Sequence, residues 1–167
     1  MKVQKNSHLT KAGWLLFYLY IILLFYFLFF SEHYGREHVF REYRYNLVLF
    51  KEIKRFITYR KQLGIESFVV NILGNILAFT PFGFMLPMLN MKYRRFFYVT
   101  FLSILFSFSI ELIQLIFKVG IFDVDDMLMN TVGGILGYIA YKIFSVFLKK
   151  LHSGKNTKKP TRKKGRT

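Results

Sequence analysis

Apolar residues along the 167-residue chain fall into four long runs that shorter polar segments separate. The first run, residues 13–30, reads GWLLFYLYIILLFYFLFF and carries no charge. About 20 apolar residues, at 1.5 Å rise per residue, cross the roughly 30 Å hydrocarbon core of a bilayer. The pattern therefore predicts four transmembrane helices, over residues 13–30, 68–89, 96–117 and 127–148.

The polar segment after the first run contains a shorter amphipathic stretch. In residues 46–63, NLVLFKEIKRFITYRKQL, apolar positions recur at helical spacing and the charged positions fall on the other side. The pattern predicts a helix that either lies in the lipid headgroup plane or packs against the bundle. The expected fold class is an all-α integral membrane bundle of four transmembrane helices with this amphipathic helix in its first interhelical segment.

Lysine and arginine positions predict the orientation of the bundle. Basic residues mark the N-terminus (residues 1–12), the link between the second and third runs, and the chain after residue 148. Cytoplasmic segments carry an excess of lysine and arginine, so both termini are predicted to be cytoplasmic and the amphipathic helix extracytoplasmic. The segment 31–67 conflicts with this orientation, because it contains eight basic residues that five glutamates offset only in part.

The first apolar run bears on signal-peptide cleavage, and the C-terminal segment bears on contact with lipid. A cleaved signal peptide at the first run is disfavoured, because the run is long and no A-x-A-like site follows it. Residues 149–167 are predicted to be a disordered polybasic tail that contacts anionic lipid, and a membrane-tethered tail meets lipid before nucleic acid. The predicted lipid contacts are Lys149, Lys150, Lys158, Lys159, Arg162, Lys163 and Lys164. Residues 13–148 then form one membrane domain.

Composition limits the chemistry of the site. The chain contains no cysteine, and its four histidines lie outside the apolar runs, which excludes thiolate sites and histidine-based zinc sites within the membrane. The formal net charge is +16, yet all the aspartates lie within residues 123–126. Asp123 is a good N-cap for the fourth helix, and Asp125 and Asp126 complement its positive end. Capping requires one or two carboxylates, so three point to an additional role.

Polar residues inside the third and fourth runs approach the same end of the bundle. Glu111 and Gln114 share one helix face, and a buried carboxylate is expensive enough to favour a functional role. Asn130 follows Asp126 by four residues, on the same face. The resulting cluster is predicted to bind a divalent cation, through Asp123, Asp126 and Glu111, or an amine or other cationic ligand. Asn71 and Asn75 in the second run are read first as interhelical hydrogen-bonding residues.

Four segments carry a resemblance to a known family. They are NLVLF (46–50), NILGNILAFTPFGFMLP (71–87), SIELIQL (109–115) and FDVDDMLMNTVGGILGY (122–138). In this order and spacing, over residues 44–141, the chain resembles the VanZ-like family of small bacterial membrane proteins. The resemblance implies an association with resistance to teicoplanin and related lipoglycopeptide antibiotics, without the precursor remodelling that defeats vancomycin, and implies no particular reaction.

The resemblance also implies a polar signature and two departures from it. Leu49 stands where the family often has proline, and Gly120 stands where it often has an arginine that Lys118 does not replace. The signature adds Asn46 and Asn75 to the predicted ligand-binding cluster. The signature positions are Asn46, Asn75, Pro81, Gly83, Glu111, Gln114, Asp123, Asp126, Asn130 and Gly133.

Three functions compete on these residues. The first is a non-enzymatic protein that binds a lipid-linked cell-wall intermediate or an amphiphilic glycopeptide at the outer leaflet and lowers teicoplanin susceptibility. The second is a membrane enzyme that acts on a lipid phosphate with a carboxylate-bound divalent metal, although no nucleophile with an adjacent base is evident. The third is a small proton-coupled transporter that uses Glu111 and forms homo-oligomers. The first is favoured, and no cofactor is expected beyond a divalent cation.

Overall fold

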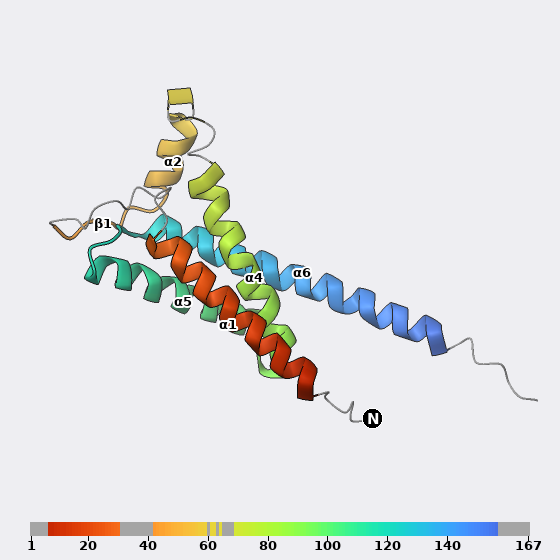
Figure 1. The fold of residues 1–167 in the computed structure, drawn as a ribbon. Coiled ribbons are helices and arrows are strands. Elements are labelled where there is room, and N and C mark those ends of the chain that lie inside the picture. The colour runs from red at the N-terminus through yellow and green to blue at the C-terminus, as the bar shows by residue number, and fades with distance from the viewer. Residues whose placement is uncertain (1–6, 31–41, 60, 63, 65–68, 157–167) are drawn as a thin grey trace, which may run out of the picture.

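The computed structural model describes residues 7–30, 42–59, 61–62, 64 and 69–156 (Figure 1). Four of its helices are long and apolar enough to cross a membrane, at residues 10–29, 71–89, 96–116 and 124–151, which confirms the four predicted spans to within three residues at each end. The elements are α1 (Ser7–Phe30), β1 (Tyr45–Asn46), α2 (Lys51–Thr58), the π-helical turn η2 (Val69–Leu73), α4 (Gly74–Leu89), the 3-10 turn η3 (Met91–Arg94), α5 (Phe96–Ile116), β2 (Phe122–Asp123) and α6 (Val124–Asn156).

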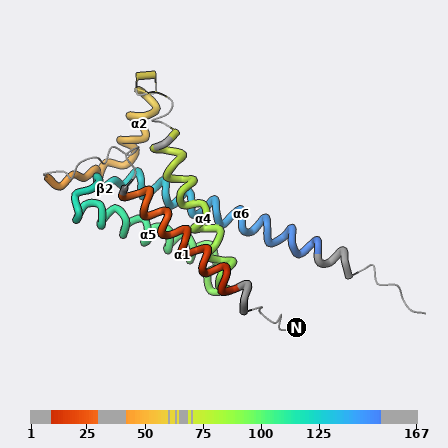
Figure 2. Tube along the Cα trace, in the orientation of Figure 1, coloured from red at the N-terminus to blue at the C-terminus, as the bar shows by residue number. Residues whose placement is uncertain are grey.

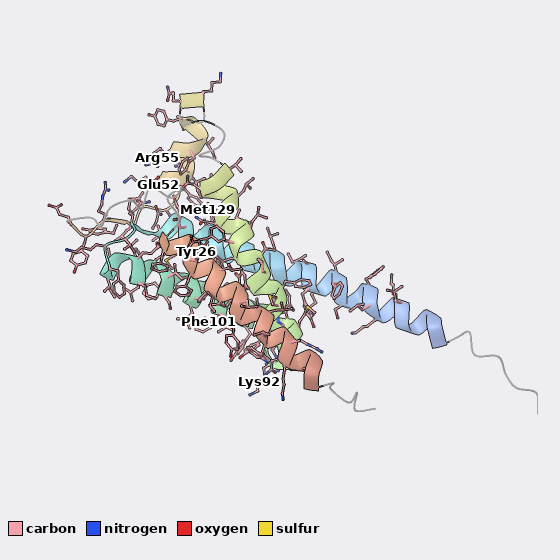
Figure 3. All side chains as sticks on the ribbon, in the orientation of Figure 1. Tyr26, Glu52, Arg55, Lys92, Phe101 and Met129 are labelled. Atoms are coloured by element: carbon pink, nitrogen blue, oxygen red, sulfur yellow. The ribbon has the colours of Figure 1, made fainter. Side chains whose placement is uncertain are left out.

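The outer surfaces of the long helices are apolar. Tyr26 on α1 and Phe101 on α5, both labelled in Figure 3, are more than half exposed, as are many neighbouring aliphatic side chains. Soluble monomers rarely expose contiguous apolar surface of this extent. The fold is therefore an all-α membrane bundle in which lipid covers these side chains.

Successive helices run in alternating directions, so that α1 and α5 end where α4 and α6 begin. The Gln114 amide donates to the Leu28 carbonyl (3.1 Å), and the Asn75 amide donates to the Asp126 carboxylate (2.8 Å). These four residues, together with Asp123, define the Asp123 end of the bundle. Figure 2 traces α2 beyond this end, and the turn η3 with Arg94 defines the opposite, Arg94 end.

The central crossing of α4 and α6 depends on glycines. A Cβ on Gly133 would lie 2.2 Å from the Ile76 carbonyl oxygen, and one on Gly137 would lie 2.0 Å from the Thr80 carbonyl oxygen. No side chain tolerates such contacts, so the two backbones touch only because both positions are glycine. Gly133 and Gly137 form a G-x-x-x-G stretch, and small residues at this spacing are typical of close helix packing in membranes.

Helix α1 closes the bundle from the side with large apolar residues. Its Phe17 packs with Phe82 and Leu86 of α4, while Leu24 and Leu28 pack against α4 and α5. The Tyr20 hydroxyl donates to the Ala78 carbonyl at 2.7 Å. Apolar packing, this hydrogen bond and the bond from Gln114 to the Leu28 carbonyl thus hold α1 in place.

The amphipathic helix predicted over residues 46–63 starts later in the structure than the sequence pattern indicates. Asn46 belongs instead to β1, which pairs in parallel with β2 and places Asn46 opposite Asp123. Phe50 has φ 65°, in the left-handed region that a bulky residue rarely adopts, so no helix passes through it. The helix therefore starts at Lys51 and packs against the bundle through the buried Phe56.

The disordered tail is predicted to begin at residue 149, but this boundary is also too early. Helix α6 continues to Asn156, and Lys149 and Lys150 are exposed on it. An existing helix extends one residue at a time without a new nucleus, and lysine is a good helix former, so a lysine-rich sequence prolongs α6 without burying a core. The other predicted lipid contacts, Lys158, Lys159, Arg162, Lys163 and Lys164, lie outside the described residues.

Candidate functional site

A pocket of about 430 Å³ opens at the Asp123 end of the bundle. Its walls come from β1, α2, η2, the end of α5 and the segment that leads into α6. Two of the lining residues, Glu52 and Arg55, are labelled in Figure 3. The lining residues are Arg44, Tyr45, Asn46, Lys51, Glu52, Arg55, Phe56, Asn71, Gln114, Gly120, Ile121, Asp123 and Asp126.

Asp123 is the centre of the hydrogen-bond network beneath the pocket. Its Oδ1 accepts from the Asp125 backbone N–H at 2.8 Å, so it caps α6 as the sequence predicts, and also from the Asn46 amide at 3.1 Å. Burial raises the pKa of the Asp123 carboxyl above its usual value, and the two hydrogen bonds lower it in part. The neighbouring carboxylates of Asp125 and Glu52 raise this pKa further.

Two residues of the predicted polar cluster, Glu111 and Gln114, lie on α5 next to this network. Glu111 is 2% exposed and its Oε2 accepts from the Asp123 backbone N–H at 3.0 Å. Gln114 is equally buried, lines the pocket and ties the end of α1 to α5 through Leu28. Glu111 therefore fixes the chain at the start of α6, and Gln114 contributes to the pocket wall.

Asp126 and Asn75 join the starts of α6 and α4. Asp126 lines the pocket and accepts from the buried Asn75 amide, which confirms the interhelical hydrogen bond predicted for Asn75. Asn71, one turn earlier in η2, lines the pocket as well. A π-helical turn shifts the direction in which its side chains point, and such turns occur frequently at functional sites.

Asp125 has a role that sequence reasoning did not find. It is completely buried, and its carboxylate accepts from the backbone N–H groups of Phe50, Glu52 and Ile53 at the start of α2. These N–H groups have no partner within their own helix, and Phe50 at the N-cap position offers no side-chain acceptor. One aspartate on α6 thus caps a second helix, and this role explains why capping uses more than one carboxylate here.

Asn130 lies deeper in the bundle and does not line the pocket. Its amide donates to the Ser107 hydroxyl at 2.9 Å, and its Oδ1 has no hydrogen-bond partner among the described residues. The predicted cluster therefore divides into three levels. Asn46, Gln114, Asp123 and Asp126 line the pocket, Asn75 and Glu111 support it, and Asn130 lies below.

The cationic side of the pocket comes from Arg44, Lys51 and Arg55, which sequence analysis did not include in the site. The amphipathic pattern places Lys51 and Arg55 on the charged face of a helix, and the only signal for Arg44 is its place two residues before Asn46. The Arg44 carbonyl accepts from the Phe122 N–H at 3.0 Å, which fixes this segment beside β2. Arg55 pairs with Glu52 at 2.8 Å. The pocket therefore presents both signs of charge.

The predicted metal ligands do not form a compact group. Within the described part of the chain, no three carboxylate or histidine side chains are arranged to hold a metal ion. Glu111 faces the Asp123 backbone, while Asp126 faces Asn75. What the arrangement can do chemically is bind a ligand that carries a phosphate or carboxylate at one point and an amine at another.

The two departures from the resembling family differ in their consequences. Leu49 is half exposed and does not line the pocket, whereas Gly120 is buried in its wall. A Cβ on Gly120 would lie 3.1 Å from the Gln114 Cβ, so a larger residue requires a small shift of that wall. The Lys118 ammonium lies over the Tyr43 ring, 4.6 Å from its centre, and does not line the pocket.

Comparisons with known proteins place the chain in a family. The VanZ/LLP1 family model matches residues 17–145, which include all four spans except the end residues of α1 and α6. Protein VanZ of Enterococcus faecium is 33% identical over 104 residues, which cover 57% of this chain and 64% of that protein, less than two thirds of its length. No solved structure matches the chain significantly. The chain therefore belongs to the VanZ/LLP1 family.

Proposed function

We propose that the chain binds an amphiphilic envelope ligand at the outer leaflet, either a lipid-linked cell-wall intermediate or a teicoplanin-type glycopeptide, and lowers susceptibility to such antibiotics. The observation that carries the proposal is the pocket of mixed charge at one end of the four membrane-spanning helices. The family's association with teicoplanin resistance directs it toward the cell envelope.

The charges of the pocket suit a ligand with both signs. Arg44, Lys51 and Arg55 offer charge-assisted hydrogen bonds to a phosphate or carboxylate, and Asp123 and Asp126 offer them to an amine. Cell-wall intermediates and glycopeptides carry both kinds of group. A ligand that pairs with both the cationic and the acidic residues of the pocket should bind more tightly than one that pairs with only one of these groups.

An apolar loop beside the pocket suits the lipid part of such a ligand. Tyr45, Leu47 and Val48 are each more than 60% exposed, and Tyr45 also lines the pocket. Exposed apolar side chains next to a polar pocket are typical of sites for amphiphilic ligands or of surfaces that enter the membrane interface. The acyl chain of the ligand would lie along this loop.

The proposed orientation places the Asp123 end outside. The Arg94 end carries Lys92, Arg94 and Arg95 in a short link, as the positive-inside rule expects of a cytoplasmic link. Among the eight basic residues of segment 31–67, Arg44, Lys51 and Arg55 line the pocket. A ligand-binding role for these three accounts for basic residues on a side where topology alone disfavours them.

The test is antibiotic susceptibility of a Gram-positive host that expresses the chain, with teicoplanin and vancomycin compared side by side. Wild type is expected to raise tolerance to teicoplanin selectively. Lys51→Gln and Asp126→Asn are expected to remove most of this effect, because one lost charged hydrogen bond costs roughly 1.5 to 3 kcal/mol, or about 10- to 150-fold in affinity. All variants are compared at equal amounts in the membrane.

Lys54→Gln is the matched control, because Lys54 lies on the same helix as Lys51, is exposed and does not line the pocket. It should protect as well as wild type. Equal protection by Lys51→Gln and Lys54→Gln would contradict binding in the pocket. An unchanged teicoplanin response in wild type would contradict the resistance role itself.

The enzyme alternative gains one specific observation. Lipid-phosphate chemistry needs cations beside the carboxylates, and Arg44, Lys51 and Arg55 supply them in the pocket lining. Purified protein would then hydrolyse a lipid pyrophosphate and release phosphate, and Asp126→Asn would abolish the release. Binding without phosphate release favours the non-enzymatic function.

A further inference from the structure

A second pocket, of about 360 Å³, lies at the Arg94 end in the fork between α4 and α6. The two helices touch at their glycine crossing and then diverge, and the second half of α6 extends beyond the other helices in Figure 1. The turn η3 fills part of the angle between them. The fork is separate from the pocket at the Asp123 end and shares none of its lining residues.

The polar part of the fork is cationic. Arg94 of η3 and Lys149 of α6 line it, and no carboxylate is among its described lining residues. Arg94 is held from both sides: its Nε donates to the Pro87 carbonyl (3.3 Å), and its own carbonyl accepts from the Tyr138 hydroxyl (2.8 Å). One bond to Pro87 leaves most of the guanidinium donors for a ligand, and their planar arrangement matches a phosphate.

The apolar part of the fork lies toward the hydrocarbon. Met88, Phe144 and Leu148 form its walls. Lys149 lies two residues from the end of the α6 span, and Arg94 lies five residues after the α4 span ends at Leu89. The cations thus sit at headgroup level, while Phe144 is more than a helical turn deeper than Lys149.

We propose that this fork binds one anionic phospholipid, with its phosphate between Arg94 and Lys149 and an acyl chain along Phe144 and Met88. Two cations without a nearby carboxylate select a negative headgroup, and the apolar walls select a lipid over a free phosphate ion. Basic pockets between transmembrane helices are suited to acidic lipid headgroups. A second copy of the chain would bring its own basic residues to the fork and be repelled.

The test is native mass spectrometry of the purified full chain with equal amounts of phosphatidylglycerol and phosphatidylcholine. Wild type is expected to retain phosphatidylglycerol preferentially. Lys149→Gln should weaken this retention about fivefold, the contribution of one basic residue at an anionic surface. Lys150→Gln removes the same charge from the next position, which points about 100° away around the helix, and should leave retention unchanged.

A second pair of variants tests the other side of the fork. Arg94→Gln is expected to weaken retention at least as much as Lys149→Gln, and Lys92→Gln, an exposed lysine of the same turn outside the fork, serves as its control. Because Arg94 also braces η3, the decisive comparison is between Lys149 and Lys150, which are exposed on the surface of α6. A thermal melt of each variant verifies folding.

Three results would overturn the proposal. Equal loss in Lys149→Gln and Lys150→Gln would mean diffuse attraction to the basic helix end. No preference for phosphatidylglycerol in wild type would mean that the fork does not select charge. Displacement of the bound lipid by millimolar glycerol phosphate would mean a phosphate site that makes no use of the apolar walls.

Discussion

The two ends of the bundle join their helices in different ways. At the Asp123 end, buried side chains link segments far apart in the sequence, as Asn46 and Asn75 do with Asp123 and Asp126. At the Arg94 end, α4 and α6 diverge around apolar walls, and Arg94 of the turn η3 forms one hydrogen bond with each of them, to Pro87 and to Tyr138. Both ends contain a pocket, but one is defined by a hydrogen-bond network and the other by the angle between two helices.

This difference separates structural carboxylates from ligand-binding ones. The carboxylates of Asp125 and Glu111 accept hydrogen bonds from backbone N–H groups. Both side chains are buried, which leaves them little access to a ligand. Asp126 and Asp123 contribute to the same network and also line the pocket. An acidic cluster in a membrane protein therefore has to be divided by its hydrogen bonds before a function is assigned to it.

The largest effect on this contrast is expected from Asp125→Ala. The change leaves three N–H groups of the α2 start without their acceptor, which should cost about 3 kcal/mol in the free energy of unfolding. Hydrogen–deuterium exchange should accelerate in residues 51–58 and remain unchanged in 91–94. Asp125→Asn, which keeps one acceptor oxygen, should lose less. Unchanged exchange in α2 would show that another group caps it.

A middle-sized effect is expected from Asn75→Leu. The substitution removes the hydrogen bond to the Asp126 carboxylate in the membrane-spanning part, which should cost about 1 to 2 kcal/mol. Thermal unfolding in detergent or lipid measures the loss. Ser109→Ala is a suitable control, because Ser109 bonds only within its own helix, to the Leu105 carbonyl. Similar losses for both variants would contradict a special role for the Asn75 bond.

The smallest effect is expected from Asn130→Leu. This change also removes an interhelical hydrogen bond, to Ser107, but it removes at the same time an oxygen that lacks a partner among the described residues. Relief of that unsatisfied acceptor offsets the loss, so the unfolding free energy should change by less than about 1 kcal/mol. A loss equal to that of Asn75→Leu would reveal a water molecule bound at the Asn130 oxygen.

The spans and the acidic residues at the pocket could be predicted from sequence, because both depend on local signals. Hydropathy marks each membrane helix without reference to its neighbours, and Glu111, Gln114 and Asp126 are conspicuous as polar residues in or beside apolar runs. The signature of the resembling family added Asn46 and Asn75. These residues could be assigned to one end of the bundle once four alternating spans were assumed.

The cationic half and the α2 cap could not be predicted, because they depend on contacts between distant segments. Lys51 and Arg55 have the pattern of a solvated helix face, and nothing local indicates that this face lines a pocket. Asp125 accepts hydrogen bonds from the N–H groups of the left-handed Phe50 and of Glu52, a contact between segments that no local pattern indicates. The pairing of β1 with β2 joins residues 77 positions apart and has no counterpart in the hydrophobic pattern.

The Asp125 cap also has a consequence for the order of assembly. The chain emerges from the ribosome from its N-terminus, so residues 45–58 are made long before Asp123 and Asp125 at the start of the last span. Until that span enters the membrane, α2 has no acceptor for its first N–H groups and β1 has no partner strand. The pocket at the Asp123 end is therefore completed last, and only a full-length bundle possesses it.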